Sequence, residues 1–265
     1  MTRPAAPFPN VFKHVVITGA STGIGAALAR SYAAPQIRLS LLARDRKRLE
    51  TVAEDCRARG AHVEPHAGDV SDAEAMESWL AACDSIQPVD LIIANAGIGG
   101  AGAVAPEFGE PGEVARRIIS VNALGVVNCV TPLLPRFVSR RAGHVAILSS
   151  LGAGLGLPDC PAYDASKAAI HAYGHALRRL LSQHGVRITV IYPGFVDTPM
   201  ARSLPFQPPF MWSADRAAAK ISRGLARGRR EIVFPWQIRI AVRAARVLPL
   251  PVVDRVLSWL RVGAW

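Results

Sequence analysis

The amino-acid sequence predicts an α/β fold in which a parallel sheet is covered by helices on both faces. Three observations support this prediction. Short apolar runs alternate along the chain with longer amphipathic stretches, and several of the runs, such as HVVIT and DLIIA, have consecutive apolar residues. Strands of a parallel sheet have this continuous pattern because both of their faces are buried. The 265 residues contain no internal repeat and no linker rich in Gly, Ser or Pro, so one domain is expected.

The expected strands and helices alternate from the first glycine-rich turn onward. His14–Thr18 (HVVIT) is a short apolar run that ends in glycines, and the helical stretch 24–33 follows it. The charged helix 45–59 is closed by Gly60, and Asp72 lies near the start of the helix 72–84. The remaining strands are expected at 37–43, 62–67, 90–94, 144–149 and 187–192, with long helices near 113–138 and 162–184.

Composition argues against several classes of protein. Half of the residues are apolar and few are aromatic, which is typical neither of a disordered chain nor of a small disulfide-stapled domain. The N-terminal segment MTRPAAPFPNVF contains three prolines and lacks the apolar core of a signal peptide. No uninterrupted apolar run reaches the length of a membrane span. A cytoplasmic location is therefore expected.

The cysteines are expected to be small buried side chains in a reducing compartment. They lie far apart and form no C-x-x-C pair, so neither a redox pair nor a metal site is predicted. These residues are Cys56, Cys83, Cys129 and Cys160.

The positive charge is concentrated near the C-terminal end. From Arg216 to Trp265 there are eleven Lys and Arg residues against two acidic residues, a net charge of +9 out of +11 for the whole chain. These arginines alternate with apolar residues at helical spacing, which suits a membrane surface better than a nucleic acid. We expect residues 1–235 to form one folded domain and residues 236–265 to form a basic amphipathic helical extension. Packing of this extension on the body or on a second subunit is the alternative.

A glycine-rich turn, TGASTGIG, follows the first strand. Its spacing G-x-x-x-G-x-G falls where a strand turns into a helix. Gly19 allows the tight turn, Gly23 lets a pyrophosphate approach the backbone, and Gly25 lets the helix pack closely on the sheet. The N-terminus of the helix then offers free N–H groups to the phosphates. This pattern predicts nucleotide binding, with an ordinary flexible turn as the alternative.

The end of the second strand distinguishes two nucleotide cofactors. An acidic side chain there would bind the ribose 2′-hydroxyl of NAD(H) and would repel a 2′-phosphate. The strand instead ends at Arg44, whose guanidinium can make two hydrogen bonds to a phosphate. Asp45 follows and is the one contrary residue, while most of the cations at 46–48 are expected to lie on a solvated helix face. NADP(H) is therefore favoured, with NAD(H) as the alternative.

Together these motifs resemble those of the short-chain dehydrogenase/reductase (SDR) family, over roughly residues 12–200. TGASTGIG resembles the family's glycine-rich turn, GDV its adenine contact, ANAG the motif after its fourth strand, and YDASK its catalytic pair. The resemblance implies a Rossmann-type doubly wound sheet and an NAD(P)-binding oxidoreductase. The cofactor-binding residues that it indicates are Gly19, Ser21, Thr22, Gly23, Ile24, Gly25, Arg44, Asp69, Val70, Asn95, Ala96, Gly97, Tyr163, Lys167, Pro193, Gly194, Val196 and Thr198.

Four residues fall on the family's catalytic positions: Asn122, Ser150, Tyr163 and Lys167. Tyr163 and Lys167 are four residues apart, so they share one face of a helix. A tyrosine hydroxyl has an ordinary pKa of about 10, and a nearby ammonium would lower it by stabilising the phenolate. Tyr163 is therefore expected to donate and accept the proton. The resemblance further implies that Ser150 holds the substrate oxygen, that Lys167 contacts the nicotinamide ribose, and that Asn122 holds a proton-relaying water.

Other polar residues near these positions are expected to have structural roles. His171 and His175 have the spacing of zinc ligands on a helix, but the glutamate of an H-E-x-x-H motif is missing, so packing or an interface is predicted. Asp164 is expected on the surface.

A substrate lid is expected at about residues 195–215. Its apolar residues would line a pocket or pack on the body, and with three leucines of the loop after Ser150 they indicate a lipophilic substrate. The lid residues are Phe195, Met200, Leu204, Phe206, Phe210, Met211 and Trp212, and the leucines are Leu151, Leu155 and Leu157.

The leading functional prediction is an NADP(H)-dependent oxidoreductase that transfers a hydride between nicotinamide and a carbonyl or alcohol carbon, with Tyr163 as acid and base. Two alternatives stay open: a non-catalytic nucleotide-binding sensor or scaffold, and an epimerase or dehydratase of the same family. The expected partners are a small lipophilic carbonyl or alcohol substrate and, by analogy, further copies of the chain in a homodimer or homotetramer. Peripheral membrane contact is predicted for the C-terminal segment, and no nucleic acid is expected.

Overall fold

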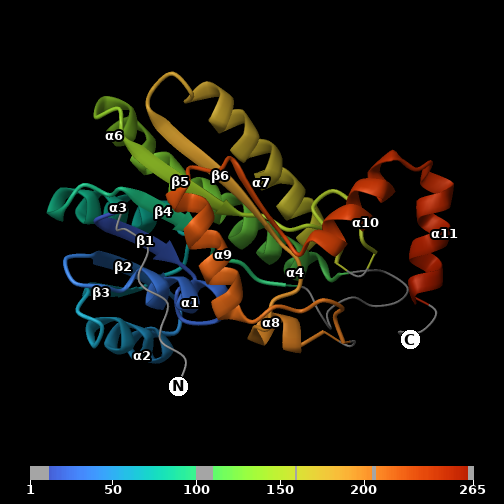
Figure 1. Ribbon diagram of the computed structural model, residues 1–265, viewed down its shortest axis with the longest axis horizontal. Coiled ribbons are helices and arrows are strands. Elements are labelled where there is room, and N and C mark those ends of the chain that lie inside the picture. The colour runs from blue at the N-terminus through green and yellow to red at the C-terminus, as the bar shows by residue number, and fades with distance from the viewer. Residues whose placement is uncertain (1–11, 100–109, 159, 205–206, 262–265) are drawn as a thin grey trace.

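A computed structural model describes residues 12–99, 110–158, 160–204 and 207–261. The described chain forms a seven-stranded parallel sheet of order β3-β2-β1-β4-β5-β6-β7 with helices on both faces (Figure 1). The predicted doubly wound parallel sheet is confirmed. The strands are β1 (His14–Thr18), β2 (Arg38–Ala43), β3 (His62–Ala67), β4 (Leu91–Ala94), β5 (Gly143–Leu148), β6 (Val186–Pro193) and β7 (Glu231–Phe234).

The helices fall into two layers and a C-terminal pair. One face of the sheet carries α1 (Gly23–Tyr32), α2 (Arg46–Arg57) and α9 (Ala214–Ala226). The other face carries α3 (Ala73–Ile86), the stretch Gly112–Ser139 and α7 (Pro161–Leu180). That stretch consists of α4 (Gly112–Ile119), a π-helical turn (Ser120–Leu124), α5 (Gly125–Val130), a 3₁₀ turn (Thr131–Leu133) and α6 (Leu134–Ser139). The remaining helices are α8 (Pro199–Arg202), α10 (Trp236–Val247) and α11 (Leu250–Arg261).

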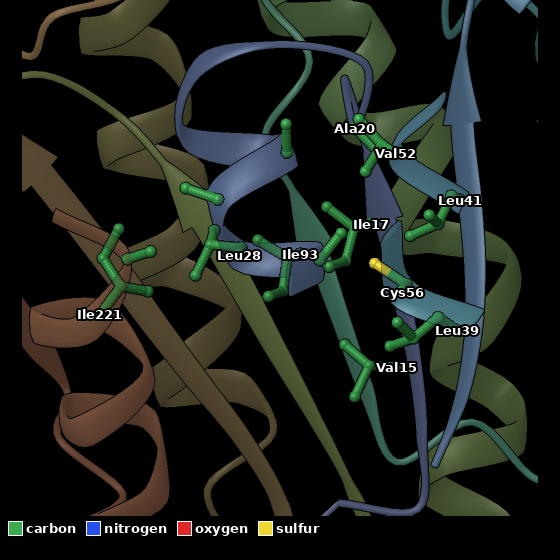
Figure 2. Packing of buried hydrophobic residues seen from close by; sticks show 14 of the residues in the cluster. Val15, Ile17, Ala20, Leu28, Leu39, Leu41, Val52, Cys56, Ile93 and Ile221 are labelled. Atoms are coloured by element: carbon green, nitrogen blue, oxygen red, sulfur yellow. The ribbon is translucent and has the colours of Figure 1, made fainter. Parts of the chain in front are cut away.

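Successive side chains of the central strands enter two separate cores. On β1, Val15 and Ile17 pack in the core with α1, α2 and α9, whereas Val16 packs in the core with α3, α5 and α7. Figure 2 shows the first core, in which Leu28 of α1 and Ile221 of α9 approach the strands. Both faces of these strands are covered, which explains why their sequences are apolar throughout.

The order of the strands determines where a ligand can bind. β1 pairs with β2 on one side and with β4 on the other, so the chain departs in opposite directions from neighbouring strands. In doubly wound sheets, ligands bind at this point, outside the carboxyl ends of the strands. The loops after β1, β2, β4, β5 and β6 all lie along this edge because the strands are parallel. The sequence motifs are therefore brought to one side of the molecule.

Three elements, α8, α9 and β7, were missing from the sequence prediction. The many basic residues of this segment obscured the apolar stripe of α9, in which Ile221 and Leu225 are buried. β7 has only four residues, of which Ile232 and Phe234 are buried. The predicted helix 113–138 is also divided into shorter segments, and Pro132 and Pro135 lie where the 3₁₀ turn passes into α6, since proline lacks a backbone N–H for the helical ladder.

Within the described residues, the stretch Gly112–Ser139 is long and apolar enough, by length and composition, to cross a membrane. Its apolar side chains pack in the interior of the protein instead. Val126, Val130, Leu133 and Phe137 are buried in the second core. The stretch is therefore a core helix that covers the sheet.

The cysteines are mostly buried, as predicted. Cys56, Cys83 and Cys129 are buried and Cys160 is half-buried. Burial raises the pKa of Cys56 to about 11 and that of Cys129 to about 12, so these two thiols stay protonated and unreactive. In the described part of the chain, no group of three or more His, Cys, Asp or Glu side chains could hold a metal ion.

Candidate active site

The glycines of the turn after β1 allow contacts that no other residue could make. Gly19 and Gly23 have φ angles of +68° and +54°, in the region where a side chain is strained. A Cβ atom on Gly19 would lie 2.8 Å from the Cα of Ala96, and one on Gly25 would collide with the carbonyl oxygen of Gly19. The absence of side chains at Gly19 and Gly25 thus allows the turn to pack closely, so that the N-terminus of α1 directly follows β1, where a phosphate can bind.

The first residues of α1 keep their N–H groups available. Thr22 is the N-cap residue of α1, but its side chain accepts no hydrogen bond from the helix. Ser21, Thr22, Gly23 and Ile24 are all partly exposed. This arrangement fits a dinucleotide, since the N-terminus of a helix attracts the charge of a pyrophosphate.

The turn after β4 is tied directly to the turn after β1. The side-chain amide of Asn95 donates to the carbonyl oxygens of Thr18 at 2.8 Å and Gly19 at 3.2 Å. The hydroxyl oxygen of Thr18 accepts from the backbone N–H groups of Asn95 and Ala96, both at 3.2 Å. A Cβ on Gly97 would lie 3.2 Å from Oδ1 of Asn122 and 3.5 Å from Nζ of Lys167. The structure therefore brings the ANAG motif between the glycine-rich turn and α7.

Arg44 and Asp45 directly follow β2, and their side chains differ in their contacts. Arg44 is exposed and makes no hydrogen bond or ion pair with any described residue. Asp45 is the N-cap of α2: its Oδ1 accepts from the backbone N–H of Arg48 at 3.0 Å, and its Oδ2 lies 3.2 Å from Nε of Arg48. The carboxylate of Asp45, which in the sequence argued against NADP(H), therefore has a structural role as a helix cap.

The GDV motif after β3 is braced from two sides. Asp69 accepts from the backbone N–H and the hydroxyl of Ser71 and from the guanidinium of Arg117. Burial alone would raise the pKa of Asp69, but these hydrogen bonds and the charge of Arg117 hold the pKa of its carboxyl below the ordinary value. Val70 is buried, and a Cβ on Gly125 would lie 2.6 Å from its side chain. Both residues are in place at the edge of the predicted nucleotide site.

The four predicted catalytic residues converge where β5 ends and α7 begins. Tyr163 lies in the first turn of α7, and the side chain of Ser150, just beyond β5, is close enough to its hydroxyl to lower its pKa. Nζ of Lys167 lies 5.6 Å from the centre of the Tyr163 ring and donates to the carbonyl oxygen of Leu148 at 2.9 Å. The predicted sharing of one helix face by Tyr163 and Lys167 is confirmed.

The charge states of this pair differ from the expectation. Burial raises the pKa of Tyr163 to about 12, and the hydrogen bond from Ser150 offsets this only in part. Burial also lowers the pKa of Lys167 to about 8. The prediction that the ammonium lowers the pKa of Tyr163 is therefore wrong for the protein alone, because burial of the hydroxyl is the largest influence on its pKa. The tyrosine is held as a neutral hydroxyl beside an easily deprotonated amine.

Asn122 lies in the π-helical turn Ser120–Leu124 and is fully buried. Its Oδ1 accepts from the backbone N–H of Ile98 at 2.8 Å, and its Nδ2 donates to the carbonyl oxygen of Ile98 at 2.9 Å and to the hydroxyl of Ser166 at 3.2 Å. A π-helical turn interrupts the regular ladder and is frequent at functional sites. Here it joins the loop after β4 to α7, so that Asn122 connects the two halves of the site.

Two acidic residues, Glu110, which the sequence analysis missed, and Asp164, which it expected on the surface, fix the start of α7. The N-cap residue Cys160 makes no side-chain cap, and Oε2 of Glu110, which precedes α4, accepts from the N–H of Ala162 at 2.7 Å instead. Asp164 was expected on the surface but is buried, and its Oδ2 accepts from the N–H of Gly156 at 2.6 Å. Asp and Glu early in a helix are a sequence signal for such contacts, but their partners are distant in the chain.

The turn after β6 closes the opposite side of the site. Thr198 caps α8 by accepting from the N–H of Ala201 at 3.2 Å, and its methyl group lies 2.7 Å from the position of a Cβ on Gly23. The N–H of Gly194 donates to the carbonyl of Phe234 at 2.7 Å, and Val196 is buried and forms a bridge with Trp212. Pro193 ends β6 and is buried. The turns after β1 and β6 are thus in direct contact.

Some residues of the predicted lid pack on the body of the protein, and others are exposed. Trp212 stacks on Phe234 with ring centres 4.9 Å apart and packs on the first core, so it belongs to the body. Met200, Phe210 and Met211 are exposed, and Met200 lies 3.2 Å from the position of a Cβ on Gly99, beside the loop after β4. Phe206 is outside the described residues. In the loop after Ser150, Leu151 is buried, whereas Leu155 and Leu157 are half-buried.

The two histidines of α7 have a packing role, as predicted. Nδ1 of His171 and Nε2 of His175 each lie 2.8 Å from the hydroxyl of Tyr192 on β6. Nε2 of His175 also lies 3.5 Å from a carboxylate oxygen of Glu231 on β7. These contacts hold the second half of α7 against the sheet.

The buried ammonium of Lys167 leads to a prediction about stability and pH. The pKa of Lys167 in the folded protein, about 8, lies below its ordinary value of 10.5. Between these values the unfolded chain binds more protons at this residue than the folded protein, so its contribution makes stability rise with pH and is most unfavourable below pH 8. We expect the free energy of unfolding of the wild type minus that of Lys167→Met to increase by about 2 kcal/mol from pH 7 to pH 10.

Urea unfolding of both proteins at several values between pH 7 and pH 10 measures this difference. The titration of other groups is common to both proteins and cancels. A difference that stays constant over this range would show that the ammonium of Lys167 is not destabilised by burial.

Comparison with known proteins identifies the family. The chain matches the short chain dehydrogenase family over residues 13–208. It is 36% identical over 251 residues to an uncharacterized oxidoreductase of Myxococcus xanthus, covering 94% of this chain and 98% of that protein. A dehydrogenase/reductase of Bos taurus, SDR family member 7B, is 36% identical over 193 residues, which are 69% of this chain and 58% of that protein.

Solved structures have the same fold. A short-chain dehydrogenase of Sphingobium yanoikuyae in complex with NADPH has a TM-score of 0.76 and 26% identity, covering 88% of this chain and 93% of that one. An SDR protein of Burkholderia phymatum in complex with NAD has a TM-score of 0.78 and 26% identity, covering 87% and 92%. The chain therefore belongs to the short-chain dehydrogenase/reductase family and is an NAD(P)-dependent oxidoreductase of that family.

Proposed function

We propose that this protein is an NADP(H)-dependent oxidoreductase that interconverts a lipophilic carbonyl compound and its alcohol. One observation carries the proposal: the hydroxyl of Tyr163 lies near Ser150 and Lys167, on the same edge of the sheet as the glycine-rich turn. A hydroxyl pair of this kind can hold one substrate oxygen between two donors. The expected roles of the remaining cofactor-binding residues rest on their places along this edge.

In the proposed reduction, the bound nicotinamide supplies a hydride to the carbonyl carbon. Ser150 donates a hydrogen bond to the substrate oxygen, and Tyr163 gives that oxygen its proton. The tyrosine carries this proton at neutral pH because its pKa lies far above 7. Lys167 stabilises the phenolate that remains, since opposite charges attract strongly where water is excluded. Oxidation of the alcohol reverses each transfer.

Arg44 supports the preference for NADP(H). It is exposed at the end of β2 and has no described partner, so its guanidinium is available to a 2′-phosphate. The carboxylate of Asp45, which would favour NAD(H), is occupied as the N-cap of α2. Solved relatives contain either cofactor: one was solved with NADPH and another with NAD. The choice in this chain is therefore proposed from its own residues.

The exposed apolar side chains around the site support a lipophilic substrate. Met200 lies beside the loop after β4, and Phe210 and Met211 follow in the lid, with exposed fractions of 38%, 55% and 46%. A hollow of about 370 Å³ beside the start of α7 is lined by Gly, Leu, Pro and Ala residues and by Asp164. Such surfaces bind apolar groups through the area that they remove from water.

The two alternatives have less support. A non-catalytic sensor would not need Asn122, Ser150, Tyr163 and Lys167 to meet at one place. An epimerase or dehydratase would use a further acid or base near Tyr163. The adjacent carboxylate, Asp164, is buried and accepts a hydrogen bond from Gly156, so it has a structural role.

We also propose that copies of the chain associate through the outer face of α7 and through Gly112–Ser139. On α7 this face carries exposed alanines at Ala165, Ala169, Ala172 and Ala176, which repeat at helical spacing and allow close approach of a second helix. Light scattering should give a mass at least twice the 28.3 kDa of the chain, and Ala169→Arg should lower it. A wild-type protein of single-chain mass would contradict the proposal.

Replacement of Tyr163 by phenylalanine tests the mechanism. The variant keeps the ring but loses the transferable proton, so turnover should fall by about 100- to 10,000-fold while NADPH affinity changes little. The measurement is NADPH oxidation with a panel of lipophilic ketones and aldehydes, together with NADPH binding by fluorescence.

Tyr173→Phe, on the same helix, is the matched control and should retain activity. A Tyr163→Phe variant with nearly wild-type turnover would refute the proposed role of Tyr163. A wild type that binds NADPH without oxidising it in the presence of any compound of the panel would favour the sensor.

Replacement of Arg44 by alanine tests the cofactor preference. The variant should lose roughly 1.5–3 kcal/mol of NADPH binding, the range for a hydrogen bond to a charged group, and should bind NADH almost as the wild type does. Titration calorimetry with both cofactors measures this. Arg46→Ala, a neighbouring exposed arginine on α2, is the control and should leave both affinities unchanged. Equal affinity of the wild type for NADH and NADPH would contradict the preference.

A further inference from the structure

Large exposed hydrophobic side chains are concentrated in the C-terminal helices. Among the described residues, twelve large hydrophobics are exposed, and six of them lie between residues 236 and 252, with exposed fractions from 44% to 84%. This concentration marks an interaction site, because single exposed apolar residues are usually scattered. We call the six residues the C-terminal apolar surface: Trp236, Ile240, Val247, Leu248, Leu250 and Val252.

One side of α10 packs on the body of the protein. Val242 is buried with Leu151, Val190 and Tyr192, and Ile238 packs against the same cluster. This contact fixes the orientation of α10, and residues on its opposite side must face outward. α10 therefore does not need a further partner to be held in place, yet it leaves an apolar stripe exposed.

The outward side of α10 combines apolar and cationic residues. Trp236, Ile240 and Val247 are spaced i, i+4 and i+11, which places them on one helix face, and the exposed Arg243 lies on the same face at i+7. The helix contains three arginines and no acidic residue. A face with large apolar groups and arginines is complementary to the boundary between lipid headgroups and acyl chains.

The following helix, α11, continues this surface. It lies beyond α10 at the edge of the molecule (Figure 1). Leu250 and Val252, at its start, are exposed to 76% and 44%. Each of the two helices has 12 residues, too few to cross a bilayer, so the pair is suited to lie on a membrane and not to span it.

Charge decides between a membrane and a second copy of the chain. Two copies that met through this surface would bring two sets of arginines together, because residues 236–261 of each copy contain five arginines and one aspartate. Their repulsion would oppose the contact. Nucleic acid would pair with the arginines but would leave the apolar side chains in water. An anionic lipid surface satisfies both kinds of side chain.

We propose that the C-terminal apolar surface, with the arginines of α10, docks this enzyme on an anionic lipid membrane. The docked helix adjoins the active site: a Cβ on Gly194 would lie 3.1 Å from Ile238, and Leu151, one residue after Ser150, packs in the same cluster as Val242. Docking therefore brings the loops of the site close to the lipid. Delivery of a lipophilic substrate from the membrane rests on the proposed function, whereas docking itself does not.

Sedimentation with vesicles tests the docking. Full-length protein is mixed with vesicles of phosphatidylcholine and phosphatidylglycerol in equal parts, or of phosphatidylcholine alone, at low salt and at about 0.5 M salt. Two double variants remove one component each: Trp236→Ser with Ile240→Ser, and Arg239→Glu with Arg243→Glu. The controls are Ile86→Ser and Arg227→Glu, exposed residues outside the C-terminal helices. Point variants are preferred to truncation because removal of α10 would uncover Leu151 and Tyr192.

The wild type should bind the anionic vesicles at low salt and be released at high salt. Each double variant should reduce the bound-to-free ratio by about tenfold or more, and the controls should bind as the wild type does. Absence of binding to anionic vesicles, or binding that neither double variant reduces, would overturn the proposal. A Trp236→Ser, Ile240→Ser variant that loses self-association in light scattering but keeps vesicle binding would also overturn it and would identify a subunit interface. None of these readouts depends on turnover.

Discussion

Two hydrogen bonds between β5 and α7 hold the reactive part of this enzyme together. Nζ of Lys167 donates to the carbonyl oxygen of Leu148 at 2.9 Å, and the hydroxyl of Ser149 donates to the carbonyl oxygen of Lys167 at 2.9 Å. They join the end of the strand to the second turn of the helix. Ser150, immediately after the strand, and Tyr163, one turn earlier on the helix, are brought near each other as a result.

Burial gives this pair its chemical character. It keeps Tyr163 protonated and lowers the pKa of Lys167 to about 8, so the protein alone holds a costly ammonium beside a neutral phenol. Loss of the phenolic proton would place a negative charge near that ammonium and relieve part of the cost. An interaction that is stronger after the proton has left than before favours the transfer. The unfavourable electrostatics of the resting site are thus consistent with the proposed acid–base role.

The loops that form the site also hold the C-terminal helix. Leu151 follows Ser150 and packs with Val242 of α10, while Gly194, after β6, approaches Ile238 closely. A shift of α10 would therefore move both the loop after β5 and the turn after β6, which lie on opposite sides of the site. These contacts give a physical reason why docking through the C-terminal apolar surface can change the access of substrate to the site. No residue of α10 has a proposed catalytic role.

The sequence by itself determined the strand–helix alternation, the order of the motifs and the helix face shared by Tyr163 and Lys167, because these depend on spacing along a few residues. Only the tertiary structure decided that Asp45 caps a helix, that Glu110 supports the start of α7, and that Asp164 is buried. It also reversed the expected pKa shift of Tyr163. Sequence patterns report local periodicity, whereas burial and partners more than 50 positions away, such as Glu110 and Ala162, exist only once the chain has packed.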